Sequence, residues 1–327
     1  EHYSLANITD KSLLYLSKAA AKAQHSAANQ IALNYYNRAL QLQQKMRQPL
    51  NLDWLHSKVE VLHILGNREE QAQALQRLRS STEGSLLLDY QWGAYYQAIS
   101  DYPRARSFAK KALRICQKDD IVSQIRCLTL LGLIEWRQGR FTSSLRYYQD
   151  ALACLAGTER LAGVASESVQ IHSGLALIYR QRGDYEKAKQ SANQALIASE
   201  QSNNRSGEAE ALTILAGIAF YERKLDLAIS YQQKALQIRR MIGDWSGEAT
   251  SLCNLANAFF EKKSYQQAEL SLREALPLLE STQKRWEQIN ARNLLGLLHY
   301  QLGDLSAAKQ EIIKGWQTAQ QIKAASG

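Results

Sequence analysis

The chain has 327 residues, more than a single hydrophobic core usually serves. It holds only three prolines and 17 glycines, too few for a sheet protein with many turns, and no apolar run approaches the roughly 18 residues of a membrane span. The formal net charge of +9 is concentrated in residues 1–50 and 101–150. Such a basic region can attract acidic partners or nucleic acid, but charged side chains on a solvated surface are the simpler explanation.

A regular spacing of small residues runs along the whole chain. Within the second helix of each expected unit, one position recurs every 34 to 44 residues: Ala32, Gln71, Ala105, Ser144, Ala188, Ala228, Ala268 and Ala308. Seven residues after each of these anchor positions come Ala39, Leu78, Ala112, Ala151, Ala195, Ala235, Ala275 and Gly315. Twelve residues before them come Ala20, Val59, Gly93, Gly132, Ala176, Ala216, Ala256 and Gly296. Because antiparallel helices approach to about 8–10 Å only where the crossing side chains are small, each unit is predicted to be a helical hairpin.

Turns are expected between the two helices of each hairpin. Gly139, Gly183 and Gly303 lie in the segments RQGRF, RQRGDY and QLGDL, where glycine permits left-handed helix termination. The corresponding segments ERKLD (222–226) and KKSYQ (262–266) lack glycine, so we expect those turns to be slightly more costly.

This pattern resembles the tetratricopeptide repeat, best at Tyr179 through Ala195 (YRQRGDYEKAKQSANQA). The period of about 40 and the recurring Ser-Gly-Glu-Ala joints at 206–209 and 246–249 resemble the long repeats of kinesin light chains and of the helical arms of bacterial signal-transducing NTPase regulators. The resemblance implies an all-α, right-handed superhelical solenoid of about eight hairpins with a concave groove. It divides the chain into a divergent segment, 1–80, and a regular array, 81–327.

The first helix adds a second resemblance. Residues 1–42 are similar to the join between the NTPase part and the repeat arm in bacterial regulators such as ATPase-coupled adenylate cyclases, sensor kinases and LuxR-type activators. The matching residues are His2-Tyr3, Ala6, Asp10, Leu14-Tyr15-Leu16, Lys18-Ala19-Ala20, Ala28-Asn29, Tyr35-Tyr36 and Arg38-Ala39-Leu40. Asn7-Ile8 stand where a glycine-containing turn is expected. The resemblance, with a first residue other than Met, implies a piece of a larger regulator; a generic repeat start is the alternative.

No constellation for enzymatic chemistry is visible. The chain lacks the glycine-rich phosphate-binding motifs, H-E-x-x-H and G-x-S-x-G, and its six histidines are scattered. Cys116, Cys127, Cys154 and Cys253 form no C-x-x-C pair, which favours free thiols and a reducing, cytoplasmic setting. Asp119-Asp120 is interpreted as a helix cap rather than an acid–base pair. We therefore expect no enzyme, cofactor or metal.

Binding residues are expected on the first helix of each hairpin, which lines the concave wall in this repeat. The position four residues after the Gly or Ala of the Leu-Gly pair gives Gln97, Trp136, Arg180, Phe220, Phe260 and Tyr300. Other inward positions give Thr213 and Asn293, Thr250 and Asn290, while Asn254 and Asn257 resemble the Asn-Leu-x-Asn of peptide-binding repeats. Asparagine donates and accepts at once, which suits a peptide unit. The alternative for the aromatic residues is core packing between units.

Three functions follow. The first is a protein-interaction arm that binds a protein or peptide segment, or folds back on the NTPase and output domains of its own full-length chain. The second is a free-standing peptide-sensing scaffold. The third, least favoured, is nucleic-acid binding through Arg104, Arg106, Lys110, Lys111, Arg114, Arg126, Arg137 and Arg140. Aromatic residues suited to base stacking are sparse around these cations. The chaperone-type carboxylate clamp is also not expected, because Thr129, Ser173, Thr213 and Cys253 occupy its basic positions.

Overall fold

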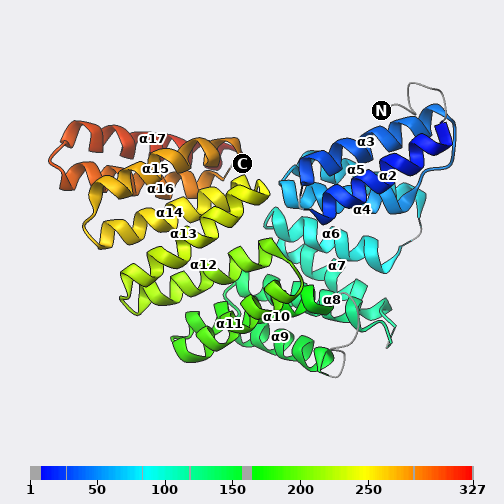
Figure 1. The fold of residues 1–327 in the computed structure, drawn as a ribbon, viewed down its shortest axis with the longest axis horizontal. Coiled ribbons are helices and arrows are strands. Elements are labelled where there is room, and N and C mark those ends of the chain that lie inside the picture. The colour runs from blue at the N-terminus through cyan, green and yellow to red at the C-terminus, as the bar shows by residue number, and fades with distance from the viewer. Residues whose placement is uncertain are drawn as a thin grey trace. The chain divides into compact units, whose positions relative to one another are not determined.

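The computed structural model describes residues 9–26, 28–82, 84–117, 119–156, 164–282 and 284–325. Within these ranges the chain forms sixteen α-helices and no strand, which confirms the all-α prediction (Figure 1). The helices are α2 (Thr9–His25), α3 (Asn29–Lys45), α4 (Leu52–Leu65), α5 (Arg68–Ser81), α6 (Leu86–Ala98), α7 (Tyr102–Ile115), α8 (Ile121–Arg137), α9 (Phe141–Leu155), α10 (Val164–Gln181), α11 (Tyr185–Gln201), α12 (Arg205–Tyr221), α13 (Leu225–Ile242), α14 (Trp245–Glu261), α15 (Tyr265–Ser281), α16 (Arg285–Gln301) and α17 (Leu305–Ala325).

Within the described residues, consecutive helices pair into eight hairpins, the number that the anchor positions predict. The chain divides into two compact units, residues 1–167 with α2 to α9 and residues 168–327 with the rest, α10 beginning just before the boundary. Inside each unit the second helix of a hairpin packs on the first helix of the next, as α3 on α4 and α13 on α14. The hairpins around Ala32 and Gln71 are complete in spite of their divergent sequences. The division at residue 80, which rested on repeat regularity, stays a prediction.

The small residues that define the repeat form the helix crossings. All 24 positions of the three predicted sets are buried. The fourth hairpin shows why they are small: the Ser144 hydroxyl donates to the Gly132 carbonyl at 2.7 Å, and a Cβ on Gly132 would lie 2.8 Å from the Tyr148 ring. The close approach of α8 and α9 therefore depends on the absence of a side chain at Gly132.

The turns inside the hairpins adopt the predicted backbone conformation. Gly139, Gly183 and Gly303 have φ values of 72°, 77° and 83°. At the two turns without glycine, Arg223 and Lys263 take the same left-handed conformation, each at φ 62°. Non-glycine residues occupy this region at a cost of about 1 kcal/mol, and the higher cost of these two turns stays a prediction.

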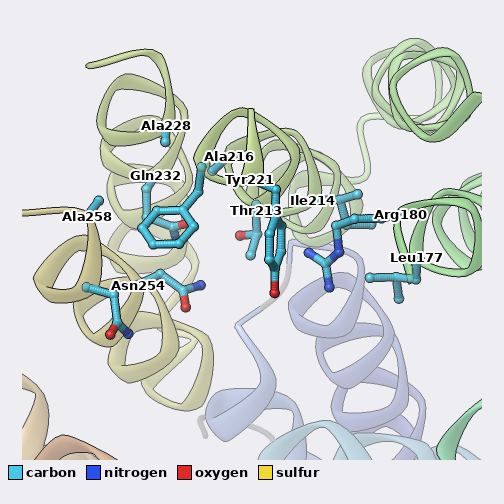
Figure 2. A pocket seen from close by; sticks show the side chains of 13 residues that line it. Leu177, Arg180, Thr213, Ile214, Ala216, Tyr221, Ala228, Gln232, Asn254 and Ala258 are labelled. Atoms are coloured by element: carbon cyan, nitrogen blue, oxygen red, sulfur yellow. The ribbon is translucent and has the colours of Figure 1, made fainter. Parts of the chain in front are cut away.

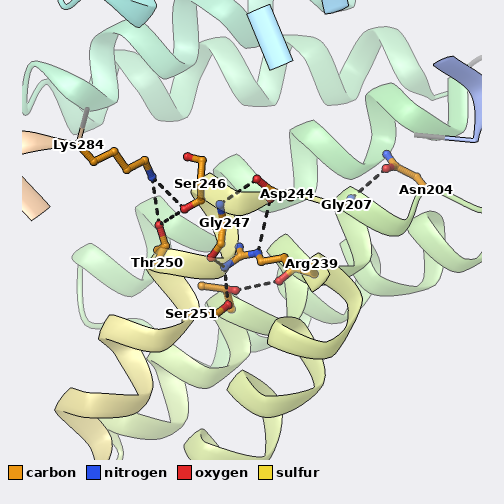
Figure 3. Close-up of polar contacts among 11 residues, drawn as sticks. Asn204, Gly207, Arg239, Asp244, Ser246, Gly247, Thr250, Ser251 and Lys284 are labelled. Carbon is orange, nitrogen blue, oxygen red and sulfur yellow. Dashed lines mark hydrogen bonds and ion pairs between the residues drawn. The ribbon is translucent and has the colours of Figure 1, made fainter. Parts of the chain in front are cut away.

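The repeated Ser-Gly-Glu-Ala segments begin α12 and α14 (Figure 3). The side chains of Asn204 and Asp244 cap these helices by accepting from the backbone N–H of Gly207 and Gly247, at 2.9 and 2.8 Å. A Cβ on Gly247 would overlap the capping carboxylate and lie 2.8 Å from the buried Arg239 side chain. The guanidinium of Arg239 in turn donates to the Gly247 carbonyl at 2.8 Å. The recurring glycine therefore leaves room for the cap and, in α14, for this arginine.

His2-Tyr3, Ala6 and Asn7-Ile8 lie outside the described residues, so the first turn is not tested. The four cysteines are free thiols, and Asp120 caps α8 by accepting from the Ser123 N–H at 3.1 Å. No helix in the described part of the chain is long and apolar enough to cross a membrane. Nor do the described histidines, cysteines and carboxylates gather into a group that could hold a metal ion.

Candidate functional site

A cavity of about 420 Å³ lies among α10, α12, α13 and α14, entirely within the second unit (Figure 2). Its size is in the range of small-ligand and peptide sites. It is lined by Leu177, Arg180, Thr213, Ile214, Ala216, Gly217, Phe220, Tyr221, Ala228, Gln232, Asn254, Asn257 and Ala258. The wall is mostly apolar, with a few polar groups: one cation, three amides and two hydroxyls.

Gln232 on α13 is the most unusual group in this wall. Its side chain is 2% exposed, and neither its amide nitrogen nor its amide oxygen has a hydrogen-bond partner among the described residues. The same repeat position, four residues after each anchor, is otherwise apolar or aromatic: Tyr36, Leu75, Ala109, Tyr148, Ala192, Leu272 and Ile312. An unsatisfied buried amide costs about 1–3 kcal/mol. Gln232 therefore lowers the stability of the folded chain at a position that is apolar or aromatic in the other hairpins.

Two further amides enter the cavity from α14. Asn254 and Asn257 are both exposed, and Asn257 donates to the Cys253 carbonyl at 3.0 Å, which leaves its amide oxygen available. Thr213, on α12, lies between Asn254 and the α10 side of the cavity (Figure 2). Its hydroxyl donates to the Ala209 carbonyl at 2.8 Å and still has acceptor capacity.

The opposite side of the cavity holds Arg180, near the end of α10 (Figure 2). Its side chain is half-buried and lies against Gly217 so closely that a Cβ there would overlap the guanidinium. Burial lowers the pKa of Arg180, while Tyr221 and Tyr185 act in the opposite direction. An arginine remains protonated under any such shift, so the cavity contains a fixed positive charge.

Two aromatic side chains, Phe220 and Tyr221, line the cavity together with Arg180. Phe220 and Tyr221 meet edge to face with centroids 6.0 Å apart, and Tyr221 also stacks on Tyr185 at 6.3 Å. Phe220 is half-buried and packs against the core of the following hairpins, whereas Tyr221 is 60% exposed. Phe220 thus contributes both to the core and to the cavity wall, and its role as a peptide anchor stays a prediction.

Five of the eleven predicted binding residues therefore line one cavity: Arg180, Thr213, Phe220, Asn254 and Asn257. The remaining six do not line it. Phe260 packs against the core and Tyr265, with centroids 5.6 Å apart, and the Thr250 hydroxyl accepts from the Lys284 ammonium at 3.1 Å. Asn290, Asn293 and Tyr300 are exposed on α16. Trp136 belongs to the first unit, where the Arg137 guanidinium lies 5.0 Å from its ring centroid. The roles of all eleven residues in binding stay predictions.

Sequence reasoning missed Gln232 and Tyr221. Gln232 could have been found, because it is the one amide in a column of apolar and aromatic residues. Tyr221 had no comparable signal, because it lies next to the inward position rather than on it.

The basic residues of the first half are mostly neutralised locally. Carboxylates lie within ion-pair distance of Arg104, Arg106, Lys111, Arg126 and Arg140. For example, Arg106 lies 2.8 Å from Glu135 and Arg126 lies 2.7 Å from Glu167. These pairs reduce the positive potential available to phosphates and weigh against the nucleic-acid hypothesis.

Comparisons with known structures show the same architecture. A chain of the APC/C hetero-tetramer Cut9-Hcn1 matches with a TM-score of 0.69 and 16% identity over 91% of this chain and 52% of that chain. A Rap protein complexed with Competence and Sporulation Factor matches with a TM-score of 0.63 and 14% identity over 81% and 76%. BtubC from P. vanneervenii matches with a TM-score of 0.57 and 17% identity over 74% and 93%. This chain thus spans about half the length of the matching Cut9-Hcn1 chain, and at these identities the likeness concerns the fold.

Family models agree with the structural likeness. No curated protein sequence matches the chain significantly. Two models, each described as a tetratricopeptide repeat, match residues 84–156 and 207–281 and residues 129–203 respectively. Together they cover more than half of the sequence. The chain belongs to the tetratricopeptide repeat family.

Proposed function

We propose that this chain is a protein-interaction module that binds a peptide or protein segment in the cavity of the second unit. The observation that carries the proposal is the buried, unpartnered amide of Gln232 in the cavity wall. An unsatisfied buried amide in a native protein calls for an explanation, and a bound molecule that pairs with it provides one. A peptide backbone offers one donor and one acceptor per residue, which matches an amide side chain.

The arrangement of the wall also favours an extended segment. Asn254 and Asn257 add amides on α14 beside Gln232, and Phe220 and Tyr221 provide apolar contact. Tyrosine and phenylalanine are effective anchors in interfaces because they bury much area with few rotatable bonds. A Rap protein of the same fold has been crystallised with Competence and Sporulation Factor, which is compatible with ligand binding by such an array. We propose that the module has no enzymatic activity of its own.

We further propose that the module is the arm of a larger cytoplasmic signalling or transcription regulator. The support is the resemblance of the first helix to the join between NTPase and repeat arm. In that case the bound segment belongs either to a partner or to the NTPase or output domains of the same chain. A free-standing peptide-sensing scaffold is the alternative, and the reading frame upstream of Glu1 distinguishes the two.

The test uses peptides selected from a random display library on the purified chain and affinities measured by calorimetry. Asn257→Ala should weaken the selected peptides at least tenfold, because a lost amide partner costs roughly 1–3 kcal/mol. Asn193→Ala is the matched control, since Asn193 is an exposed asparagine of α11 that does not line the cavity. Both side chains are exposed, so melting curves should not change. Equal effects of the two substitutions, or no selected peptide at all, would contradict the proposal.

A further inference from the structure

We infer that the ligand of this cavity carries a carboxylate and that Arg180 is the residue that pairs with it. This inference rests on the proposed function, because it specifies the charge of the segment that the cavity binds. Arg180 lacks a counter-ion among the residues that the structure describes, departs from the repeat pattern at its position and lies in an otherwise uncharged wall.

The first observation is that Arg180 has no ion-pair partner within the described ranges. Other arginines with little exposure in the second unit are paired: Arg239 lies 3.9 Å from Asp244, and Arg292 lies 2.9 Å from both Glu280 and Glu311. The groups that act electrostatically on Arg180 are the phenols of Tyr185 and Tyr221, and no carboxylate is among them. A half-buried charge without a partner is unfavourable unless something else neutralises it.

The second observation is that two exceptions to the repeat pattern meet at this point. Where Arg180 stands, the hairpins on either side place aromatic rings, Trp136 and Phe220. Where Gly217 stands, the hairpins on either side place larger side chains, Leu177 and Asn257. The guanidinium of Arg180 occupies the space that a side chain at Gly217 would fill. The missing side chain on α12 thus accommodates the cation on α10, which indicates a built position rather than a solvated surface charge.

The third observation concerns what surrounds the charge. The residues lining the cavity include no Asp, Glu, Lys or second Arg. Hydroxyl and amide groups, such as Thr213, Tyr221 and Asn254, are the other polar groups of the wall. A guanidinium pairs well with a planar carboxylate through two parallel hydrogen bonds, whereas phosphate sites in proteins usually gather several cations. A single arginine in an otherwise uncharged wall therefore favours a carboxylate.

A carboxylate in a peptide comes from an Asp or Glu side chain or from the C-terminus. Two display libraries separate these sources: one in which the random peptide is fused at its C-terminus, so that only side chains supply carboxylates, and one in which the C-terminus is free. Each is selected on the wild-type chain, on Arg180→Glu and on Arg182→Glu. Arg182 is an exposed arginine of the following turn, outside the cavity, so its reversal changes the net charge equally.

On the wild type and on Arg182→Glu we expect an Asp or Glu at one fixed position, or a requirement for the free C-terminus. On Arg180→Glu we expect Lys or Arg at that position instead. Changing the selected Glu to Gln, or amidating the C-terminus, should weaken wild-type binding at least tenfold and have little effect on Arg180→Gln. Peptides that need Asn257 but show no acidic preference would overturn the inference and leave the proposed function intact. Peptides insensitive to Asn257→Ala would remove the proposed function and this inference together.

Discussion

Replacing Gln232 with leucine should stabilise the second unit while it weakens ligand binding. The side chain is 2% exposed and both of its polar atoms lack partners, so the folded chain bears the full desolvation cost of one amide, about 1–3 kcal/mol. Leucine has a similar volume and occurs at the equivalent position of the next hairpin, where Leu272 is fully buried. We therefore expect Gln232→Leu to raise the free energy of unfolding by about 1–3 kcal/mol.

The assay must resolve single hairpins, because repeat arrays do not unfold as one cooperative unit. Hydrogen exchange followed by mass spectrometry on peptides from α12 to α14 gives the local opening free energy, and urea unfolding gives the overall effect. Leu272→Gln is the matched control. It places the same amide in an apolar position outside the cavity and should lower local stability by about 2–4 kcal/mol.

The opposite result would refute the reasoning. If Gln232→Leu lowers the local stability by 1 kcal/mol or more, the amide forms hydrogen bonds in the free protein and no ligand is needed to explain it. If the substitution stabilises the unit but leaves peptide affinity unchanged, Gln232 belongs to the core and not to the binding wall.

Three further predictions test the fold and its electrostatics. Lys263→Gly should stabilise its turn by about 1 kcal/mol in urea unfolding, because Lys263 has φ 62° and only glycine adopts that conformation freely. Gly303→Lys, at the equivalent turn of the last hairpin, should destabilise the chain by a similar amount. Gly247→Ala should lower the free energy of unfolding by about 2 kcal/mol or more, since the added methyl overlaps the α14 cap. Gly139 has open space around it, so Gly139→Ala should show only the backbone cost of its positive φ. Burial and Arg68 lower the pKa of His63 from 6.5 to about 4, so the unfolded chain binds the proton more readily and stability should fall as pH drops from about 6.5 to 4. His63→Gln should reduce this loss, and an unchanged pH profile would show that another group causes it.

The repeat architecture could be predicted from sequence because it depends on local geometry. A helix crossing needs a small residue whatever its neighbours are, so the spacing that Ala188, Ala228 and Ala268 exemplify revealed every hairpin. The turn at Gly183 was equally predictable, because left-handed backbone conformations favour glycine in any context. Even the non-glycine turn at Lys263 followed from the period alone.

The candidate site was predicted only in part. The repeat register identified Arg180, Phe220 and Asn257 as facing one side, because side-chain direction along a helix is periodic. It also named Tyr300 and Phe260 by the same rule, although neither lines the cavity. Their equivalence along the sequence does not make their surroundings equal, since exposure depends on which side chains the adjacent helices supply.

What the sequence by itself determined is the order, number and pairing of the hairpins, because each depends on contacts between neighbours in the chain. Only the tertiary structure decided which positions form a cavity and which groups in it lack partners. The contact of Arg180 with Gly217 joins residues that lie 37 positions apart on different hairpins. Whether a polar group is satisfied is a property of all the atoms within about 3.5 Å of it, and no spacing along one chain specifies them.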